Sequence, residues 1–331
     1  MAEVLRVGLI GTGGISRDAH IPAWRSLPGV EVVALAEPVP ESRARALALL
    51  GDPGGGRVRA FPDYRALLAA EAPDVIDVTI PVGPAKAEAI AAALRAGCHV
   101  TCQKPFAADE ATAAALVDEA RRRGRLLSVN QQARFASAFA RARRWVEEGR
   151  LGALRTIRLW SDFPNAGSRQ WLEYAVHSFD LVRFWAGREP RRVSAWRKQQ
   201  TAAGHELLAV WLDFDGVLAA EVWDEMSSST TLRWGFRLMG EAGSARGHEA
   251  FGPRMMPAEV AFTPVGAVAE TVEPAGLPYL PHAFAAYFGA FLAALRGQGP
   301  CPSSGEDNLR TLRLAFAVRE AAAAGAWVPL G

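Results

Sequence analysis

The first part of the chain alternates between short apolar runs and longer segments in which apolar residues recur at helical spacing. The apolar runs are predicted to be strands and cover residues 4–10, 30–36, 58–61, 75–80, 99–102 and 126–130. The segments predicted to be helices are 41–50, 63–70, 86–96 and 109–124. Strands that alternate with helices of about ten to fifteen residues are typical of parallel βαβ units. This part is therefore predicted to be an α/β domain with a doubly wound parallel sheet.

The pattern changes beyond Phe135, where strand-like runs follow one another without helices between them. The predicted strands are 154–160, 192–198, 207–214, 217–223 and 231–239. The predicted helices are 137–148, 171–186, 281–296 and 308–324. Consecutive strands without crossover helices pair antiparallel. The second part is therefore predicted to be an α+β domain with an open, mostly antiparallel sheet and helices on one face.

A glycine-rich turn follows the first predicted strand and reads Gly11-Thr12-Gly13-Gly14-Ile15-Ser16. It fits the pattern G-x-G-x-x-G with serine in the last place, where a small residue still permits close helix packing. The glycines let the backbone approach a pyrophosphate at a helix N-terminus, where free amides and the helix dipole favour negative charge. The motif alone leaves open a glycine turn that binds no ligand.

Glu37 ends the second predicted strand, at the place where an acidic side chain binds the ribose hydroxyls of a dinucleotide. A carboxylate there also repels a 2′-phosphate, so NAD is favoured over NADP. Together with the glycine turn, Glu37 predicts a dinucleotide-binding, Rossmann-type domain over residues 1–126. Residues 127–331 then form a second domain, with the strand at 126–130 at the junction.

Composition and charge exclude several other classes of protein. The 331 residues are 50% hydrophobic and 22% charged with a net charge of +2, so no overall field attracts nucleic acid or an anionic membrane. The three cysteines, Cys98, Cys102 and Cys301, are too few for a disulfide framework and are predicted to be reduced thiols. We find no signal peptide, no apolar window of about 18 residues and no metal-ligand spacing. A cytoplasmic protein is therefore expected.

Lysine is rare in this chain and occurs only at positions 86, 104 and 198. Lys104 lies in Gln103-Lys104-Pro105, directly after a strand and thus at the carboxyl edge of the sheet, where open α/β folds bind ligands. Several motifs, which together span nearly the whole chain, resemble the Gfo/Idh/MocA oxidoreductase family. They are the glycine turn, Thr79-Ile80-Pro81, the run from Ala96 to Pro105, Gly149-Arg150-Leu151-Gly152 and Ser303-Ser304-Gly305-Glu306-Asp307.

The resemblance implies which residues bind the cofactor. The family's strand-end motif is usually Glu-Lys-Pro, and its lysine contacts both substrate and cofactor, so Lys104 is assigned both roles and Gln103 replaces the glutamate. A solvated loop lysine is the alternative for Lys104. Lys86 falls where relatives often carry a histidine near the cofactor. The predicted cofactor-binding residues are Gly11, Thr12, Gly13, Gly14, Ile15, Glu37, Thr79, Pro81, Gln103 and Lys104.

A second family signature resembles Asp-x-Gly-x-His-x-x-Asp, and residues 173–180 here read Glu-Tyr-Ala-Val-His-Ser-Phe-Asp. The resemblance implies that His177 is catalytic. Glu173 replaces the aspartate four residues earlier, on the same helix face, where its carboxylate can orient the imidazole or stabilise its charge. Without the resemblance, a packed helix histidine would be the favoured alternative. Asp180 is expected to be a packing or capping residue.

Two further positions match family contacts to the substrate. Arg134 follows the strand at the domain junction, with a hinge salt bridge as its alternative, and Asp162 follows the strand ending at Trp160, with a capping acid as its alternative. Seven of the ten tryptophans lie between 160 and 234. Most are expected on a sheet face or an oligomer interface, and Trp160, Trp171 and Trp234 are candidates for pocket walls. The resemblance implies a homodimer or homotetramer and assigns substrate binding and oligomerisation to residues 127–331.

The implied activity is that of an NAD(P)-dependent oxidoreductase that interconverts a secondary alcohol and a ketone on a sugar, polyol or cyclitol. In the oxidative direction His177 takes the hydroxyl proton, Lys104 holds and polarises the oxygen, and hydride passes to the nicotinamide. Glu173 orients His177, and no metal is required. Two alternatives stay open. One is glycoside cleavage through transient oxidation by tightly held NAD. The other is a non-enzymatic dinucleotide-binding sensor, against which the presence of both Lys104 and His177 argues.

Overall fold

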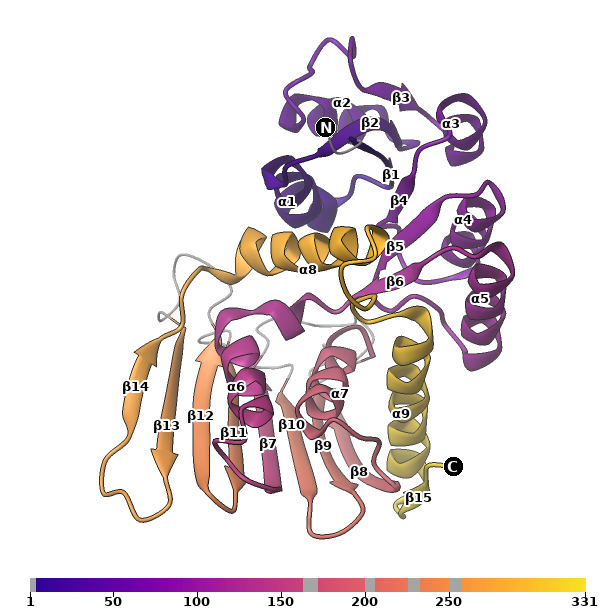
Figure 1. Ribbon diagram of the computed structural model, residues 1–331. Helices are drawn as coiled ribbons and strands as arrows, with labels where there is room; N and C mark the ends of the chain where they lie inside the picture. The colour runs from indigo at the N-terminus through magenta and orange to yellow at the C-terminus, as the bar shows by residue number, and fades with distance from the viewer. Residues whose placement is uncertain (1–3, 163–171, 200–205, 226–232, 250–257) are drawn as a thin grey trace. The chain divides into compact units, whose positions relative to one another are not determined.

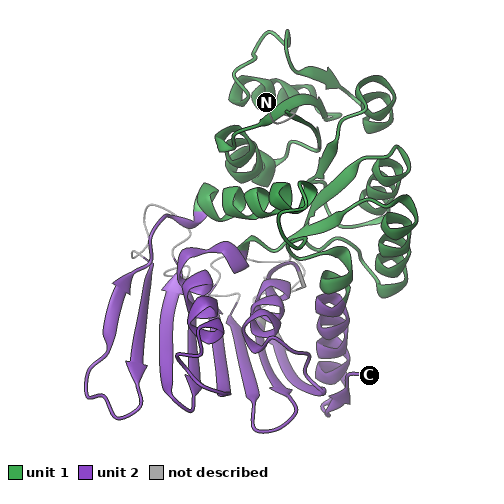
Figure 2. Ribbon diagram, viewed as in Figure 1, with its two compact units in different colours: residues 1–132, 280–309 green, residues 133–279, 310–331 purple. Residues whose placement is uncertain are grey.

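The computed structural model describes residues 4–162, 172–199, 206–225, 233–249 and 258–331 (Figure 1). The chain divides into two compact units (Figure 2). Unit 1 comprises residues 1–132 and 280–309, and unit 2 comprises residues 133–279 and 310–331. Each unit is described separately below.

Unit 1 contains a six-stranded parallel sheet in its described residues. The strands are β1 (Leu5–Ile10), β2 (Val30–Ala36), β3 (Arg59–Phe61), β4 (Val75–Val78), β5 (His99–Gln103) and β6 (Leu127–Asn130). Their order is β3-β2-β1-β4-β5-β6, and every neighbouring pair is parallel. The order reverses direction on either side of β1, as in other doubly wound sheets. The predicted fold class of this part is therefore confirmed.

Helical segments connect these strands. They are the π-helical turn Ser16–His20 with α1 (Ile21–Ser26), α2 (Pro40–Leu49), α3 (Tyr64–Glu71), α4 (Pro84–Arg95) and α5 (Glu110–Arg123). Local sequence explains their ends: the side chains of Asp63 and Asp109 cap α3 and α5, and Gly124 ends α5 with φ +60°. The helices predicted between the strands are thus present, with small differences at their ends.

A distant segment of the chain completes unit 1. Helix α8 (Tyr279–Leu295) brings Phe288 onto the indole of Trp24, with ring centroids 4.0 Å apart and the rings stacked. The buried hydroxyl of Tyr287 hydrogen-bonds with Thr101 of β5 and Ser128 of β6. The predicted boundary at 126/127 differs from this arrangement, because β6 pairs with β5 and α8 supplies part of the core of unit 1.

Unit 2 contains a nine-stranded, mostly antiparallel sheet in its described residues. The strands are β7 (Leu154–Asp162), β8 (Arg192–Gln199), β9 (Glu206–Asp213), β10 (Ala219–Glu225), β11 (Arg233–Gly240), β12 (Gly243–Glu249), β13 (Glu259–Pro264), β14 (Thr271–Pro274) and β15 (Val328–Pro329). Their order is β14-β13-β12-β11-β7-β10-β9-β8-β15. Strands β7 and β10 pair in parallel, while the other neighbouring pairs for which register is defined are antiparallel. This confirms the predicted class of the second part.

Helices α6 (Ser137–Glu147), α7 (Leu172–Ala186) and α9 (Gly305–Ala324) accompany this sheet, and a 3-10 turn (Gln132–Phe135) precedes α6. Helix α6 packs on β12 and β13, and α7 packs on β7 and β10 (Figure 1). The buried core beneath them is aromatic: the rings of Phe139, Trp185, Trp234 and Phe236 are in contact with one another. Burial of such large apolar side chains is the main source of stability for a sheet covered on one face.

The opposite face of this sheet is exposed and carries four tryptophans. Trp160, Trp196, Trp211 and Trp223 come from β7, β8, β9 and β10 and are 38–47% exposed. Trp160 and Trp223 are register partners across the β7–β10 pair. We call these four residues the outer sheet face. The prediction that most tryptophans lie on a sheet face therefore holds for this group.

The three cysteines are free thiols, as expected. Burial raises the pKa of the Cys98 thiol to about 11 and that of Cys102 to about 12. Both side chains therefore act as small buried hydrophobes rather than as nucleophiles. Across the described residues we find no helix that combines the length and hydropathy needed to cross a bilayer.

Candidate functional site

The glycine turn lies at the carboxyl end of β1, next to the ends of β2 and β4. Gly11 has φ +89°, and a Cβ on this residue would lie 2.7 Å from Cγ2 of Ile80, so only glycine fits. Its amide donates to the carbonyl of Ala36 at 2.9 Å. Gly13 and Gly14 differ from it, because both are exposed and a Cβ on either would meet no atom within 4 Å. Their backbone is therefore open to a ligand.

A dinucleotide fits the residues around this turn. The exposed backbone of Gly13 and Gly14 leads through Ile15 into the helical segment Ser16–His20, so their amides stand at a helix start, where a pyrophosphate binds. The hydroxyl of Ser16 is buried and has no hydrogen-bond partner among the described residues. Ile15 is exposed and has helical backbone angles. The predicted residues Gly11 to Ile15 thus form one continuous segment.

Glu37 is held against the glycine turn. Its Oε2 accepts the amide of Thr12 at 2.8 Å and the hydroxyl of Thr12 at 3.2 Å, while its Oε1 accepts the amide of Val39 at 3.0 Å. The residue is 8% exposed. Neutral donors thus fix the carboxylate at the end of β2, and they leave its negative charge at the place where the ribose of a dinucleotide would bind.

Two arginines that were not predicted from the sequence hydrogen-bond around the glycine turn and the end of β2. Arg17 donates to the carbonyl of Thr12 and, at 2.9 Å, to the hydroxyl of Ser42. Arg43 donates to the carbonyl of Glu37. Arginine is so frequent in this chain that composition gives no signal for either residue. Their bonds tie the glycine turn and the end of β2 to the start of α2.

Thr79 joins the same group, and Pro81 follows it. The amide of Thr79 donates to the carbonyl of Ile10 at 2.8 Å, and its hydroxyl donates to the carbonyl of Gly11 at 2.7 Å. Pro81 is exposed beyond the end of β4. The structure therefore brings Gly11, Thr12, Glu37 and Thr79 into direct contact.

Gln103 and Lys104 lie at the end of β5. The side-chain oxygen of Gln103 accepts the amide of Lys104 at 3.1 Å, and the peptide bond from Lys104 to Pro105 is cis. Gln103 is buried, whereas Lys104 is partly exposed. The neutral amide that replaces the family's usual glutamate thus acts as an acceptor for the residue that follows it.

His177 and Glu173 both lie on α7 in unit 2. His177 is 6% exposed, and its ring centroid is 5.6 Å from that of the buried Trp234. Glu173 is partly exposed one helical turn earlier. Residues four apart on a helix share a face, so the carboxylate is on the side of the helix that carries the imidazole. Trp160 lies on the outer sheet face instead and forms no wall on the α7 side. Trp171 is outside the described residues.

A buried carboxyl that was not predicted from the sequence lies beside this group. Asp224 of β10 accepts the hydroxyl of Ser161 and, at 3.0 Å, that of Ser178, the residue after His177. Burial raises the pKa of Asp224 to about 6, against the effect of both hydroxyls, and the charge of Asp162 adds to the rise. A signal did exist: the inward positions of β10 read Ala220, Val222 and Asp224, so an acid interrupts an apolar face.

Asp162 lies at the end of β7, where its register partner on β10 is Glu225. Its side chain is partly exposed. Asp162 therefore lies at the end of β7 that is next to Asp224 of β10. Across the described residues we find no group of three or more histidine, cysteine or acidic side chains placed to hold a metal ion.

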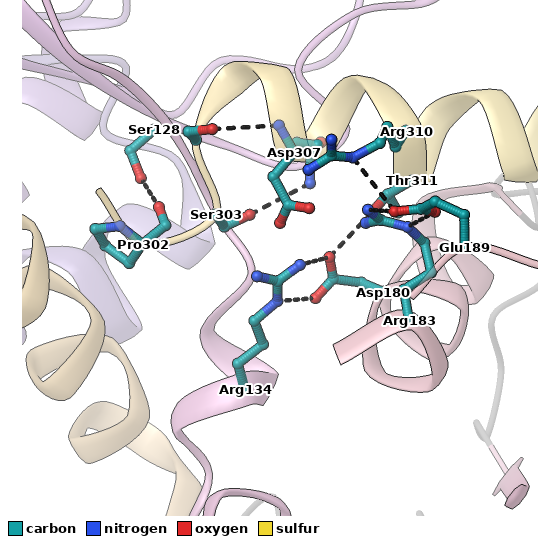
Figure 3. A network of polar contacts seen from close by, with 12 residues as sticks. Ser128, Arg134, Asp180, Arg183, Glu189, Pro302, Ser303, Asp307, Arg310 and Thr311 are labelled. Atoms are coloured by element: carbon teal, nitrogen blue, oxygen red, sulfur yellow. Dashed lines mark hydrogen bonds and ion pairs between the residues drawn. The ribbon is translucent and has the colours of Figure 1, made fainter. Parts of the chain in front are cut away.

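Arg134 forms a two-point ion pair with Asp180 of α7 (Figure 3). Nε and one terminal nitrogen of Arg134 each lie 2.6 Å from a carboxylate oxygen, and the arginine side chain is 13% exposed. Asp180 also accepts the hydroxyl of Thr311 at 3.0 Å, and Thr311 in turn accepts Arg183. The salt-bridge alternative thus describes the visible contact of Arg134, and Asp180 is its buried ion-pair partner. A substrate contact by Arg134 stays a prediction.

Comparison with known proteins identifies the family. Residues 5–131 match the model of an oxidoreductase family with an NAD-binding Rossmann fold, and residues 139–246 match the C-terminal domain model of the same family. The chain belongs to the Gfo/Idh/MocA family. It is accordingly an enzyme of the dehydrogenase and reductase class.

Similar proteins include sugar and inositol dehydrogenases. D-apiose dehydrogenase of Paraburkholderia graminis is 27% identical over 97% of this chain and 88% of its own length. Inositol 2-dehydrogenase of Corynebacterium glutamicum is 26% identical over 73% of this chain and 72% of its own length. An oxidoreductase from Agrobacterium radiobacter, solved with NAD+, L-tartaric acid and magnesium, has a TM-score of 0.86 at 21% identity and covers 98% of both chains. This last likeness shows a shared fold.

Proposed function

We propose that this protein is an NAD-dependent dehydrogenase that interconverts a secondary alcohol and a ketone on a sugar, polyol or cyclitol. One observation carries the proposal: a histidine on α7, His177, has a carboxylate, Glu173, one helical turn earlier, in a chain whose other unit has an NAD-binding fold. The substrate class is supported by the named activities of the apiose and inositol dehydrogenases that resemble the chain.

Residues of unit 1 would hold the cofactor. The amides at Gly13 and Gly14 fit its pyrophosphate, and Glu37 fits a ribose with free hydroxyls. Thr12 and Thr79 keep the glycine turn in shape, because the Thr12 amide donates to Glu37 and the Thr79 hydroxyl donates to the carbonyl of Gly11. Pro81, Gln103 and Lys104 are proposed for the nicotinamide end. The proposal for NAD over NADP rests on the fixed charge of Glu37.

The proton and the oxygen are handled by side chains. His177 takes the proton of the substrate hydroxyl in the oxidative direction, and the carboxylate of Glu173 stabilises the resulting imidazolium. Lys104 donates a hydrogen bond to the same oxygen, which stabilises the negative charge that develops there as the proton leaves. Bound NAD supplies the acceptor for the hydride that leaves the same carbon. Arg134 and Asp162 are proposed to contact the substrate's other oxygens.

The outer sheet face is proposed to bind a second copy of this chain in the cytoplasm, giving a homodimer or homotetramer. Four exposed tryptophans on adjacent strands form an apolar surface of the kind that marks subunit interfaces. The ion pair between Arg158 and Glu221, at 2.9 Å on the same face, supplies a polar element beside them.

The decisive experiment is a 340 nm screen of purified protein with NAD or NADP against inositols, aldoses, sugar acids and glycosides, with product analysis in parallel. Formation of NADH with one substrate group supports the proposal and names its substrate class. Glycoside cleavage without net NADH overturns it in favour of transient oxidation. Dinucleotide binding without turnover of any compound, together with effector-dependent binding of a protein, overturns it in favour of a sensor.

A further inference from the structure

Lys86 is a lysine in the core of unit 1. It is the third residue of α4, and it is 1% exposed, which places it among the largest fully buried side chains in the described part of the chain. An ammonium ion loses its hydration when it is buried, so a lysine is rarely kept inside unless its charge and its donors are used.

The ammonium of Lys86 hydrogen-bonds to the loop that carries Lys104. It donates to the carbonyl of Gln103 and, at 2.9 Å, to the carbonyl of Pro105. These two carbonyls stand immediately before and after Lys104 in the sequence. The amide of Lys104 itself donates to the side-chain oxygen of Gln103 at 3.1 Å. The backbone of Lys104 is thus held at three consecutive residues.

The charge of Lys86 also reaches the end of β5. It acts on the thiol of Cys102, two residues before Lys104, by lowering the pKa that burial raises. A neutral donor would hold two carbonyls at a smaller desolvation cost, so the buried charge needs an explanation beyond packing. Both hydrogen bonds of the Lys86 ammonium go to the short segment Gln103-Lys104-Pro105, and its charge acts next to the same segment.

We propose that Lys86 is a positioning residue for Lys104. The ammonium of Lys86 fixes the backbone before and after Lys104 and thereby sets the direction in which the Lys104 side chain projects. The inference rests on the proposed function only for its effect on turnover. The effect on the environment of Lys104 is independent of what Lys104 does.

The chain is well suited to a direct test, because it has three lysines. Brief labelling with an amine-reactive reagent, followed by peptide mass spectrometry, reports Lys104 and Lys198 separately within one sample. Lys198, on β8, is exposed and serves as the internal reference. The variants are Lys86→Met, which removes the charge and both hydrogen bonds, and Lys86→Gln, whose amide nitrogen is one bond closer to the backbone. Lys198→Met is the matched control for turnover and NAD affinity only, because it removes the labelling reference.

We expect the ratio of Lys104 to Lys198 labelling to change at least threefold in Lys86→Met and in the same direction, by less, in Lys86→Gln. With an active substrate, kcat falls at least tenfold in Lys86→Met, while the affinity for NAD stays within threefold and Lys198→Met behaves as wild type. A wild-type labelling ratio in either Lys86 variant that folds overturns the proposal. An altered ratio with unchanged kcat supports the positioning of Lys104 and instead overturns its catalytic assignment.

Discussion

Asp224 accepts a hydrogen bond from Ser178, the residue that directly follows His177 on α7. The bond links β10, in the middle of the unit 2 sheet, to the helix that carries the proposed base. A buried carboxyl thus sets the seating of that helix on the sheet. The protonation state of Asp224 therefore affects how the helix that carries His177 packs on the sheet.

The stability of the protein should depend on the protonation of Asp224. Its pKa rises from 3.8 to about 6 in the folded state, so folding favours the protonated form. This contribution is complete below about pH 4 and is lost as the pH rises through 6, a total of roughly 3 kcal/mol. Asp224→Asn should remove the dependence, because an amide carries no charge at any of these pH values.

Urea unfolding of Asp224→Asn and wild type at pH 4.5 and pH 8 checks this prediction. The difference in unfolding free energy should move in favour of the variant as the pH rises. Other titrating groups cancel in that difference. Asp215→Asn, at an exposed position, is the control and should show no such trend. A difference between Asp224→Asn and wild type that does not change with pH would contradict the assignment.

Removing Arg134 should destabilise unit 2 rather than merely weaken substrate binding. Arg134→Met leaves the fully buried Asp180 without its two-point partner, at a cost of about 3–5 kcal/mol. Arg134→Met combined with Asp180→Asn should recover at least half of that loss. Thermal and urea unfolding measure both variants. A single variant that keeps wild-type stability would contradict the stabilising role of the ion pair, and a raised KM in that variant would leave only the proposed substrate contact.

Lys104→Met and His177→Ala should each lower kcat by a factor of about 100 or more, the usual scale for the loss of a positioned proton-transfer or polarising group. The affinity for NAD, followed by titration calorimetry, should fall by no more than about threefold even for Lys104→Met, because the proposed contacts to the pyrophosphate and the ribose at Gly13, Gly14 and Glu37 remain. Lys198→Met is the control for a lysine substitution. Near-normal turnover in either variant would contradict the catalytic role proposed for the substituted residue.

Glu37→Gln should reduce the preference for NAD. The amide oxygen can still accept the Thr12 amide, but the charge that repels a 2′-phosphate is gone. We expect the ratio of the NADP to the NAD dissociation constant to fall about tenfold, which corresponds to about 1.4 kcal/mol. Glu41→Gln, exposed at the start of α2, is the matched control. An unchanged ratio for Glu37→Gln would mean that another group selects the cofactor.

Trp223→Glu should dissociate the oligomer that we propose. It places a charge in the middle of the outer sheet face, next to its register partner Trp160. Light scattering coupled to size exclusion should show a shift towards monomer. Leu49→Glu, which changes an exposed apolar residue of α2, should leave the mass unchanged. A wild-type protein that is already monomeric at micromolar concentration would refute the proposal.

The parallel sheet of unit 1 was readable from the sequence because each strand is an apolar run bounded by turn residues. Strands β12, β13 and β14 were not predicted. Strand β12 reads Gly-Ser-Ala-Arg-Gly-His-Glu and has no β-branched run. It is a strand because of its neighbours: a Cβ at Gly247 would lie 2.5 Å from the carbonyl of Glu259 and 2.8 Å from the ring of Phe236. Such tertiary fit leaves no local signal.

The candidate site likewise contains residues that the sequence could predict and contacts that it could not. Gly11 and Glu37 could be found because a motif and a strand end mark them. The partners of these residues could not, since hydrogen bonds such as that from Thr12 to Glu37 join segments 25 residues apart. Lys86 was noticed by position alone, and its contact with the loop of Lys104 depends on how α4 packs against β5. The Arg134 pair depends on a helix that begins 38 residues later.

Helix α8 has a consequence for how the chain is made. Tyr287 bonds to Thr101, 186 residues earlier, and Phe288 stacks on Trp24. Unit 1 therefore lacks a wall of its core until the ribosome has passed residue 309, by which time every described strand of the other sheet except β15 has been synthesised. An N-terminal fragment that stops at residue 132 would expose Trp24 and the polar groups that meet Tyr287. We therefore expect that residues 1–132 expressed alone do not fold stably. During synthesis, unit 1 completes its folding only after α8 has been made, and α8 follows most of unit 2 in the chain.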